Sequence, residues 1–340
     1  MTLTSGFDID LRVVGEASFG AALMYFTGAR AHTIALRRRA MARGWKLNEY
    51  GLFAGERCLA AAREEEIYAR LGLPWISPLL RENRGEIAAA EAGTLPQLLR
   101  LSDIRGDLHC HTRAGEGTAS VAEMAAAARA LGRDYLAITD RVRGPGVARG
   151  LDPEALAAQL DEIDALNARL RGIRILKSCE VEIDEDGRLA LRRDLLERLD
   201  FTVCAIHTGL SAPREALTAR LLRAMDDPAF TILAHPSVLL IGKGAPPALD
   251  LERVMRAALE RGCTLEVNAR PERLDLDDVH CKMAREMGLK LVVCSDARSP
   301  AELALMRFGV DQAARGWLEA RDVLNTRPVP ALLASLQREG

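Results

Sequence analysis

Two histidines separated by a single residue, His109 and His111, lie in the short stretch Gly106-Asp-Leu-His-Cys-His-Thr112. On a β-strand, residues two apart point to the same face, so the two imidazoles would project side by side. Adjacent imidazoles often share a metal ion, although a lone His-x-His also arises by chance. The chain has only six histidines, and His207 and His235 also follow apolar, strand-like runs. The four histidines together predict a metal site.

The elements that must position these histidines follow a regular order from residue 105 onward. Helical segments rich in Ala, Leu and Arg alternate with strands that we predict at residues 107–112, 135–140, 174–183, 201–207, 231–236, 264–269 and 290–297. Two helix starts carry capping signals, a capping box from Ser120 to Glu123 and the pair Asp152-Pro153. Seven strand–helix units in about 235 residues favour a parallel α/β barrel over an open sheet.

The predicted strand ends carry most of the polar residues that could do chemistry. In barrel enzymes the active site lies at the carboxyl ends of the strands. Here those ends bear four histidines, three acids and one amide, namely His109, His111, Asp140, Glu180, His207, His235, Asn268 and Asp296. A capped strand end would explain any one of them. Their joint placement predicts that they converge on one metal-binding rim.

Composition limits the classes of function. The 340 residues are 49% hydrophobic and carry a net charge of −2, so any nucleic-acid site must be local. Aromatic residues make up only 4%, which leaves few platforms for stacking single-stranded bases. The seven cysteines form no C-x-x-C pair and lie mostly in apolar runs, which indicates buried thiols in a reducing compartment. With no membrane-length apolar run and no signal peptide, we expect a cytoplasmic protein without a membrane partner.

The first 80 residues predict a small α+β domain. We expect a strand over residues 7–14, a basic helix over 32–43, an edge strand or turn over 48–53 and a short helix that starts at Glu64. Asp8 and Asp10 lie on the predicted strand, but two carboxylates without further ligands make a weak metal site, and a solvated edge strand is the favoured interpretation.

A mixed, charged stretch follows this domain. Residues 81–104 predict a linker that contains a helical segment over 85–92, followed by Gly93-Thr-Leu-Pro96. We therefore expect the domain boundary in this stretch.

The N-terminal segment resembles the end of the palm and the thumb of family X DNA polymerases. The resemblance rests on Asp10-Leu-Arg12, Tyr25-Phe-Thr-Gly28 and Asn48-Glu-Tyr-Gly51. It implies that Asp10 matches a catalytic carboxylate, that Tyr25 and Phe26 match residues beside the nucleotide sugar, and that Arg37 matches a template-side arginine. Thr33 departs from the asparagine expected there.

The same resemblance implies parts that do not precede Met1, namely two further catalytic aspartates, a nucleotide-binding palm and a DNA-binding region. We therefore expect no polymerase activity from this chain on its own. The chain would be a natural short form or a fragment, and a polymerase half on a separate chain stays open as a partner.

Residues 105–340 resemble the PHP (polymerase and histidinol phosphatase) domain of bacterial family X polymerases. The motifs Asp-Leu-His-Cys-His-Thr, Ala-Ile-Thr-Asp, Glu-Val-Glu-Ile and Ala-His-Pro carry this resemblance. It implies a distorted seven-stranded (β/α)7 barrel with a metal cluster that cleaves phosphate esters. In the polymerases this domain is associated with 3′–5′ exonuclease activity and related processing of 3′ ends.

The resemblance also implies a ligand set. His109, His111, Glu180 and Asp296 match the ligands of one metal. Glu180, His207 and His235 match those of a second metal, with Glu180 as the bridge. Imidazole and carboxylate ligands suit Zn²⁺, Mn²⁺ or Fe²⁺, so we expect two such divalent ions as cofactors.

Three other residues stand where the family holds a third metal, namely Glu116, Arg141 and Arg298. A guanidinium is always charged and cannot ligate a metal, but it binds phosphate oxygens bidentately. Our hypothesis is that the third metal is lost and that the two arginines pair with Glu116 or hold the substrate phosphate. The alternative is simple decay of a redundant domain.

Three functions remain open from the sequence. The first is a metal-dependent phosphoesterase acting on DNA 3′ ends, in which two metals would activate a water, Asp140 would orient a ligand or a water, and the arginines would stabilise phosphate charge. The second is a phosphatase of small phosphate esters, of the histidinol-phosphatase kind. The third is a catalytically silent module with a structural or regulatory role.

Overall fold

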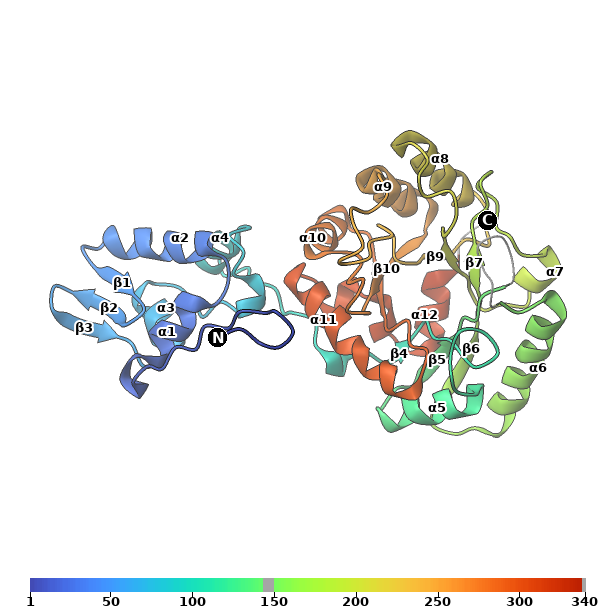
Figure 1. The fold of residues 1–340 in the computed structure, drawn as a ribbon, viewed down its shortest axis with the longest axis horizontal. Coiled ribbons are helices and arrows are strands. Elements are labelled where there is room, and N and C mark those ends of the chain that lie inside the picture. Colours follow the sequence, from blue (N-terminus) through green and yellow to red (C-terminus); the bar gives the residue numbers. More distant parts are fainter. Residues whose placement is uncertain (143–149, 338–340) are drawn as a thin grey trace. The chain divides into compact units, whose positions relative to one another are not determined.

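The computed structural model describes residues 1–142 and 150–337, and the chain forms two compact units, Met1–Pro96 and Gln97–Gly340 (Figure 1). The boundary between them falls inside the linker predicted over residues 81–104. Residues 81–96 are not a free connector, because they belong to the first unit.

The first unit packs helices on a small antiparallel sheet. The sheet order is β1 (Lys46–Asn48), β2 (Gly51–Ala54) and β3 (Arg57–Ala60). The Asn48 side chain accepts hydrogen bonds from the backbone nitrogens of Tyr50 and Gly51, which builds the predicted turn. The remaining elements are η1 (Glu16–Ser18), α1 (Phe19–Phe26), α2 (Arg30–Met41), α3 (Glu64–Arg70), η2 (Pro78–Leu80) and α4 (Glu86–Glu91), so the predicted helices are confirmed.

The strand predicted over residues 7–14 does not form. Nearly all of this segment is exposed, and its single bridge joins Thr2 and Asp8, whose side chains also share a hydrogen bond of 2.6 Å. The alternation of apolar residues favours a strand. Among the described residues, however, no neighbouring strand pairs its backbone groups with this segment. Asp8 and Asp10 therefore lie on an exposed segment rather than on a strand.

A buried ion pair ties the end of the first unit to its helices. Arg81 has no exposed surface, and its Nη1 and Nη2 donate to the two oxygens of Glu64 at 2.6 and 2.9 Å. Its Nε donates to the Ile76 carbonyl, and its guanidinium carbon lies 5.3 Å from the centre of the Tyr68 ring. Every donor group of this guanidinium is thus engaged, which is what makes its burial tolerable.

We predict that Arg81→Met lowers the free energy of unfolding of the first unit by about 3–5 kcal/mol, because it leaves the Glu64 carboxylate buried without its cation. Urea unfolding followed by hydrogen exchange of peptides from residues 19–91 measures this change. The control is Glu64→Gln in the Arg81→Met background, which removes the stranded charge and recovers part of the loss. Equal stability of Arg81→Met and the native chain would contradict the prediction.

The second unit contains eight parallel strand segments among the described residues. One sheet has the order β4 (Gly106–Asp107), β5 (Tyr135–Ile138) and β6 (Arg174–Lys177). The other has the order β11 (Leu291–Cys294), β10 (Thr264–Asn268), β9 (Ile232–Leu233), β8 (Val203–Ala205) and β7 (Glu180–Glu182). A parallel bridge from Cys110, after β4, to Ala297, after β11, and another from Arg141, after β5, to Glu180 in β7 connect the two sheets, which gives a barrel-like arrangement.

The strand predicted over 174–183 is divided into β6 and β7. At the break, the Ser178 hydroxyl donates to the Phe201 carbonyl at 2.9 Å, and the Cys179 thiol donates to the Asp140 carbonyl at 3.2 Å. These side-chain bonds add to the backbone bonds that Cys179 and Glu180 make with the neighbouring strands where the chain passes from one sheet to the other. Glu180 is consequently the first residue of β7, immediately after this step.

Successive residues of a strand belong in turn to two separate hydrophobic clusters, as expected for a barrel. The pairs Val203 and Ala205, Ile232 and Ala234, and Val292 and Cys294 belong to one buried cluster that also contains Leu324, Leu332 and Leu336 near the C-terminus. Their neighbours Cys204, Leu233 and Val293 pack instead with helix residues such as Leu221 and Val254. The period of two thus separates the barrel interior from the helix layer.

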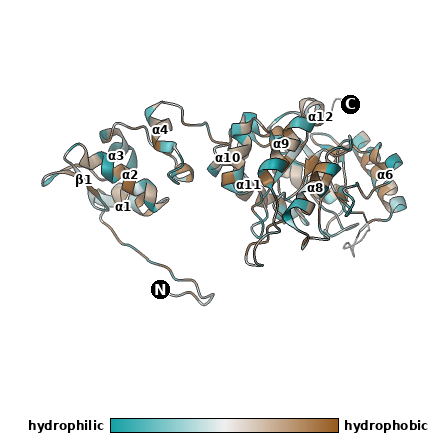
Figure 2. Ribbon diagram, turned by 90° about the horizontal axis from the view of Figure 1, so that it is seen from above, coloured by the Kyte–Doolittle hydropathy of each residue, from teal (hydrophilic) through white to brown (hydrophobic). Residues whose placement is uncertain are grey.

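Helices surround the strands of the second unit (Figure 1). They are α5 (Val121–Ala130), α6 (Pro153–Arg169), α7 (Arg193–Leu196), α8 (Arg214–Ala224), α9 (Leu251–Arg261), α10 (Asp278–Met287), α11 (Met306–Arg315) and α12 (Val329–Leu336), with short 3₁₀ turns η3 (Leu101–Asp103), η4 (Pro300–Leu305), η5 (Ala320–Asp322) and η6 (Leu324–Thr326). Hydrophobic and hydrophilic residues mix along them, as suits helices that bury one face (Figure 2). The predicted capping box at Ser120 and the N-cap at Asp152 are confirmed.

The fold can be compared with two expectations drawn from composition, which concern the cysteines and membrane-spanning helices. Six of the seven cysteines are buried free thiols, as predicted, and only Cys58 is exposed. Among the described residues, every helix is too short or too polar to cross a bilayer.

Candidate metal centre

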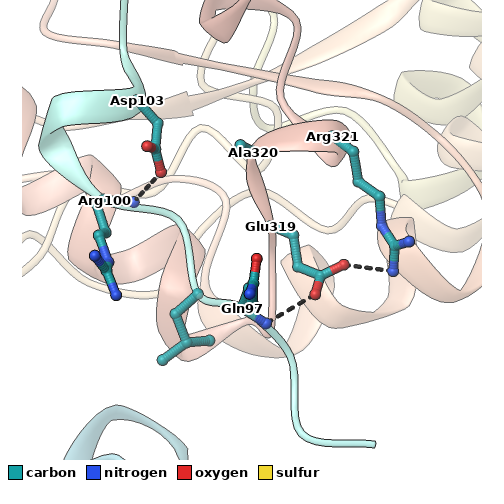
Figure 3. Close-up of a pocket in the computed structure, with 7 residues that line it drawn as sticks. Gln97, Arg100, Asp103, Glu319, Ala320 and Arg321 are labelled. Carbon is teal, nitrogen blue, oxygen red and sulfur yellow. Dashed lines mark hydrogen bonds and ion pairs between the residues drawn. The ribbon is translucent and has the colours of Figure 1, made fainter.

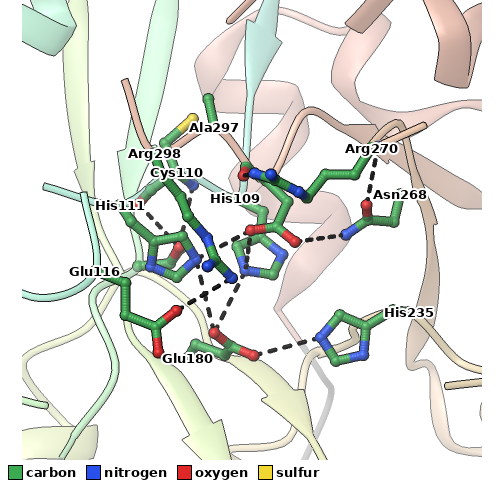
Figure 4. Close-up of polar contacts among 12 residues, drawn as sticks. His109, Cys110, His111, Glu116, Glu180, His235, Asn268, Arg270, Ala297 and Arg298 are labelled. Carbon is green, nitrogen blue, oxygen red and sulfur yellow. Dashed lines mark hydrogen bonds and ion pairs between the residues drawn. The ribbon is translucent and has the colours of Figure 1, made fainter. Parts of the chain in front are cut away.

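The strand ends bring the predicted metal ligands together, as Figure 4 shows for several of them. His109 and His111 follow β4, Glu180 opens β7, His207 and His235 follow β8 and β9, and Asp296 follows β11. The parallel register pairs Asn268 with Cys294, which brings Asp296 close to the end of β10. Residues more than 180 positions apart in sequence therefore meet at one place in the barrel.

His109, His111 and Glu180 form one group with the spacing of a metal site, and Asp296 lies beside both histidines. His111 Nε2 lies 3.2 Å from Asp296 Oδ1 and 3.7 Å from Glu180 Oε2. His109 Nε2 lies 3.6 Å from the same Glu180 oxygen and 3.9 Å from Asp296 Oδ1. Ligands at about 2.1 Å from a tetrahedral ion would be roughly 3.4 Å apart, so these distances suit one small divalent cation. We call this group site A.

A second group shares the same carboxylate. The other oxygen of Glu180, Oε1, lies 3.1 Å from His207 Nε2 and 3.4 Å from His235 Nε2. We call Glu180, His207 and His235 site B. One carboxylate thus presents one oxygen to each group, which is the arrangement needed to bridge two ions.

The chemistry of the donors fits a metal. His109, His111, His235 and Glu180 are each at most 4% exposed, and the buried atoms His109 Nε2 and Asp296 Oδ1 have no hydrogen-bond partner. Buried polar atoms normally have partners, so these two atoms are left for a ligand outside the chain. A set of imidazole and carboxylate donors suits Zn²⁺, Mn²⁺ or Fe²⁺.

Outer contacts fix the orientation of the ligands. His109 Nδ1 donates to Glu266 Oε1 at 2.8 Å, and His207 Nδ1 donates to Glu182 Oε2 at 2.6 Å. Both bonds put the ring proton on Nδ1 and leave the Nε2 lone pair facing the site. Asn268, which we predicted at the rim, donates to Asp296 Oδ2 at 3.1 Å and so orients that carboxylate.

Sequence reasoning missed Glu266. It lies inside β10, and its carboxylate also accepts from the His235 backbone nitrogen at 2.7 Å. The available signal was an acid two residues before Asn268 in an otherwise apolar strand, since that spacing puts both side chains on one face. Sequence reasoning also missed Arg220, whose buried guanidinium lies 3.6 Å from Glu182 Oε1.

The electrostatics of the centre follow from its burial. Burial alone would raise the pKa of Glu180, but the neighbouring His109, His207 and His235 outweigh it and hold the pKa well below the usual range. Burial opposes protonation of His109 and His207, yet the carboxylates beside them raise both pKa values. For His235, burial and the nearby Arg273 lower the pKa. Without metal, the excess of buried carboxylates is thus balanced by imidazolium groups.

Asp140 supports the centre from behind. Its Oδ1 accepts from the Thr112 backbone nitrogen at 2.7 Å, and its Oδ2 accepts from the Thr112 hydroxyl and from Gln159 Nε2. His111 Nδ1 lies 3.8 Å from Oδ1, which is beyond hydrogen-bond distance. In this geometry Asp140 holds the loop that carries His111.

The three residues predicted at the third metal position form a cluster of their own. Arg141 Nη1 lies 3.2 Å from Glu116 Oε1, and Arg298 Nη2 lies 3.1 Å from Glu116 Oε2. Arg141 Nε also lies 3.4 Å from Glu180 Oε2. Figure 4 shows Arg298 reaching toward Glu116 beside His111. One of the two predicted roles, pairing of both arginines with Glu116, is therefore present in the structure.

A surface pocket of about 550 Å³ lies apart from these residues (Figure 3). Its acidic groups are already engaged, because Glu319 pairs with Arg321 and accepts from the Gln97 backbone nitrogen, while Asp103 accepts from the Arg100 backbone nitrogen. None of the predicted ligands lines this pocket, so the chemistry belongs to the buried centre.

Two family models match the chain, the DNA polymerase beta thumb over residues 22–82 and the PHP domain over residues 107–270. A probable phosphatase of Thermoanaerobacter sp. (strain X514) is 30% identical over 65% of this chain and 89% of its own length. The chain belongs to the PHP family. Membership places it among metal-dependent phosphoric ester hydrolases.

Both units of this PHP protein recur in one longer relative. "DNA polymerase/3′-5′ exonuclease PolX" of Bacillus subtilis (strain 168) is 38% identical over 97% of this chain, and the chain spans 58% of that protein's length. The chain therefore corresponds to the thumb and PHP part of a bacterial family X polymerase. A histidinol phosphate phosphatase structure from Lactococcus lactis, complexed with zinc, L-histidinol and phosphate, aligns at 13% identity with a TM-score of 0.44, over 62% of this chain and 93% of its own.

We predict that Glu182→Gln weakens zinc binding at site B by about 10- to 100-fold, because an amide no longer holds His207 in the ligating tautomer as strongly. Competition with a chromophoric chelator measures the affinity. Glu185→Gln, at an exposed position three residues away, is the matched control and should bind zinc like the native chain. Equal affinities for both variants would contradict the assigned role of Glu182.

Metal binding should also be coupled to proton release. In the metal-free protein the pKa values of His109 and His207 are raised, so both rings hold a proton at higher pH than usual. Ligation requires neutral imidazole, so Zn²⁺ must displace these protons, and its apparent affinity should rise with pH until both rings are neutral. Calorimetry near pH 7 in buffers of different ionisation enthalpy measures the release. A binding heat that does not depend on the buffer would refute this coupling.

Proposed function

We propose that this chain is a phosphoesterase that hydrolyses the terminal phosphodiester at DNA 3′ ends, in the manner of a 3′–5′ exonuclease, with a two-metal centre. His109, His111, Glu180 and Asp296 would hold one ion, and Glu180, His207 and His235 would hold the other. The observation that carries the proposal is the Glu180 carboxylate, whose two oxygens face separate histidine groups. A DNA substrate is favoured by the thumb unit, which occurs beside the PHP domain in PolX.

When bound, the two divalent ions would supply an activated water and positive charge for the phosphate oxygens. The chain's own residues do the rest. Glu266 and Glu182 keep the Nε2 atoms of His109 and His207 aimed inward, and Asn268 fixes Asp296. Asp140 holds the Thr112 loop in place behind His111. Low exposure of these groups excludes bulk water and strengthens every charge interaction.

Several finer features belong to this proposal. If β6 and β7 count as one interrupted strand, the barrel has seven strands. The third metal is lost, because two of its three positions are arginines that pair with Glu116. The division into a thumb-like segment (1–80), a linker (81–104) and a PHP barrel (105–340) is our domain proposal. We also expect no DNA polymerisation by this chain alone, with a separate polymerase half as a candidate partner.

A small phosphate ester is the second candidate substrate. It is favoured by the similarity of residues in the second unit to proteins described as probable phosphatases, which cover this chain only in part. A silent structural module is the third candidate, favoured by the two arginines beside the centre. The preferred substrate distinguishes the first two candidate functions, and absence of hydrolysis of both substrates identifies the third.

The test compares release of nucleotides from 3′-labelled single-stranded DNA with release of phosphate from a small phosphomonoester, both with added Mn²⁺. We predict that DNA is the preferred substrate and that His235→Ala lowers the rate by at least about 100-fold, since it removes a ligand of the centre. His280→Ala on α10 lies outside the centre and should retain activity. Preference for the monoester would favour the second candidate, and hydrolysis unaffected by His235→Ala would refute the proposed centre.

A further inference from the structure

Arg141 and Arg298, beside the centre, have more hydrogen-bond donors than Glu116 accepts from. Arg141 and Arg298 each direct one terminal nitrogen at a Glu116 oxygen, at 3.2 and 3.1 Å. The buried atoms Arg141 Nη2 and Arg298 Nε have no hydrogen-bond partner among the described residues. Because buried guanidinium nitrogens are rarely left unpaired, these two donors indicate a missing acceptor at the cluster.

The charges of the cluster also favour an anion. Two guanidiniums face one carboxylate of Glu116, so one positive charge is not balanced within the cluster. Arg141 is turned toward Glu180 as well, at 3.4 Å from its Oε2 oxygen, so the cluster borders site A. An oxyanion seated on the arginines would therefore lie next to the proposed reaction centre. Guanidiniums recognise phosphate oxygens by paired donors, in the same way that they pair with a carboxylate.

The loop that carries Glu116 is held in place from both sides. The Thr118 backbone nitrogen donates to the Arg298 carbonyl at 2.8 Å, and the Gly117 nitrogen donates to the Thr112 carbonyl at 2.8 Å. A Cβ atom at Gly117 would lie 2.6 Å from the His111 carbonyl oxygen and 2.9 Å from that of Arg298. The backbone therefore stays close to both residues, while the Glu116 side chain is 20% exposed and so reaches solvent in part.

We propose that Arg141 and Arg298 form a binding site for a phosphate group of the substrate, and that Glu116 occupies the two guanidiniums until phosphate displaces it. The proposal rests on the proposed function, because it assigns the substrate's phosphate to one side of that same centre. Glu116 is then an internal competitor that mimics the anion. Arg141 and Arg298 position the phosphate beside Glu180, and they do so without serving as metal ligands.

The test measures binding of inorganic phosphate to the metal-loaded full chain by calorimetry, with no turnover. Glu116→Gln should bind phosphate at least about fivefold more tightly, because the neutral amide competes less for the arginines. Arg298→Ala should bind about tenfold more weakly, and Arg298→Lys should lie between, since it keeps the charge but loses the paired donors. Glu162→Gln and Arg169→Ala, both exposed on α6, are matched controls and should leave the dissociation constant unchanged.

The direction of the Glu116→Gln effect decides between this proposal and its alternatives. If Glu116 were a metal ligand, the variant would bind phosphate more weakly, and if the cluster were only a structural ion pair, none of the variants would change the affinity. Either result overturns the proposal. Arg298 is 39% exposed, so its Lys variant should fold, and an unchanged dissociation constant there is equally decisive. Absence of hydrolysis would refute the proposed function but would leave these binding results standing.

Discussion

The rest of the second unit depends on one constraint, the burial of the Glu180 carboxylate. This group is 4% exposed and its pKa is held well below the usual range, so it stays charged inside the barrel. A buried charge must be paired, and the groups that contact it come from four other segments of the chain. His109, His207, His235 and Arg141 each lie within 3.7 Å of its oxygens. The barrel is the scaffold that brings these distant residues to one carboxylate.

The same constraint explains why the outer carboxylates matter. Glu182 and Glu266 lie on β7 and β10 and bond to the far side of histidines that face Glu180. Without them the rings could turn, or could carry the proton on the wrong nitrogen. Arg220 in turn bonds to the carbonyls of Ile183, Thr208 and Asp184 while lying near Glu182. The contacts that order the metal ligands thus extend to α8.

Much of this centre could be predicted from the sequence, because strand ends and ligand types are both local features. The period-two strands placed six predicted ligands at strand ends that the structure brings together, and capping signals located the helices that begin at Val121 and Pro153. What failed depended on long-range partners. The strand over 7–14 needs a neighbour that the described chain does not offer, and the burial of Arg81 in the first unit depends on its ion pair with Glu64. Glu266 was missed because its role exists only once β10 lies beside His109.

The role of Arg141 and Arg298 could not be decided from the sequence, because it depends on which groups their side chains contact. Arg141 and Arg298 could have pointed away from each other, and decay of the site would have left them without a common partner. Instead both bind Glu116, and Arg141 also approaches Glu180. Two guanidiniums carry the same formal charge as one divalent cation. The electrostatic balance of this corner is therefore kept when arginines stand where the family resemblance implies a third metal.

The central claim is that this PHP protein holds two ions on either side of Glu180 and none at Glu116. Anomalous diffraction from crystals grown with Zn²⁺ or Mn²⁺, measured at the absorption edge of that metal, tests it most directly. The account predicts two peaks, one among His109, His111 and Asp296 and one between His207 and His235. A third peak beside Glu116, or no peak in contact with Glu180, would contradict it.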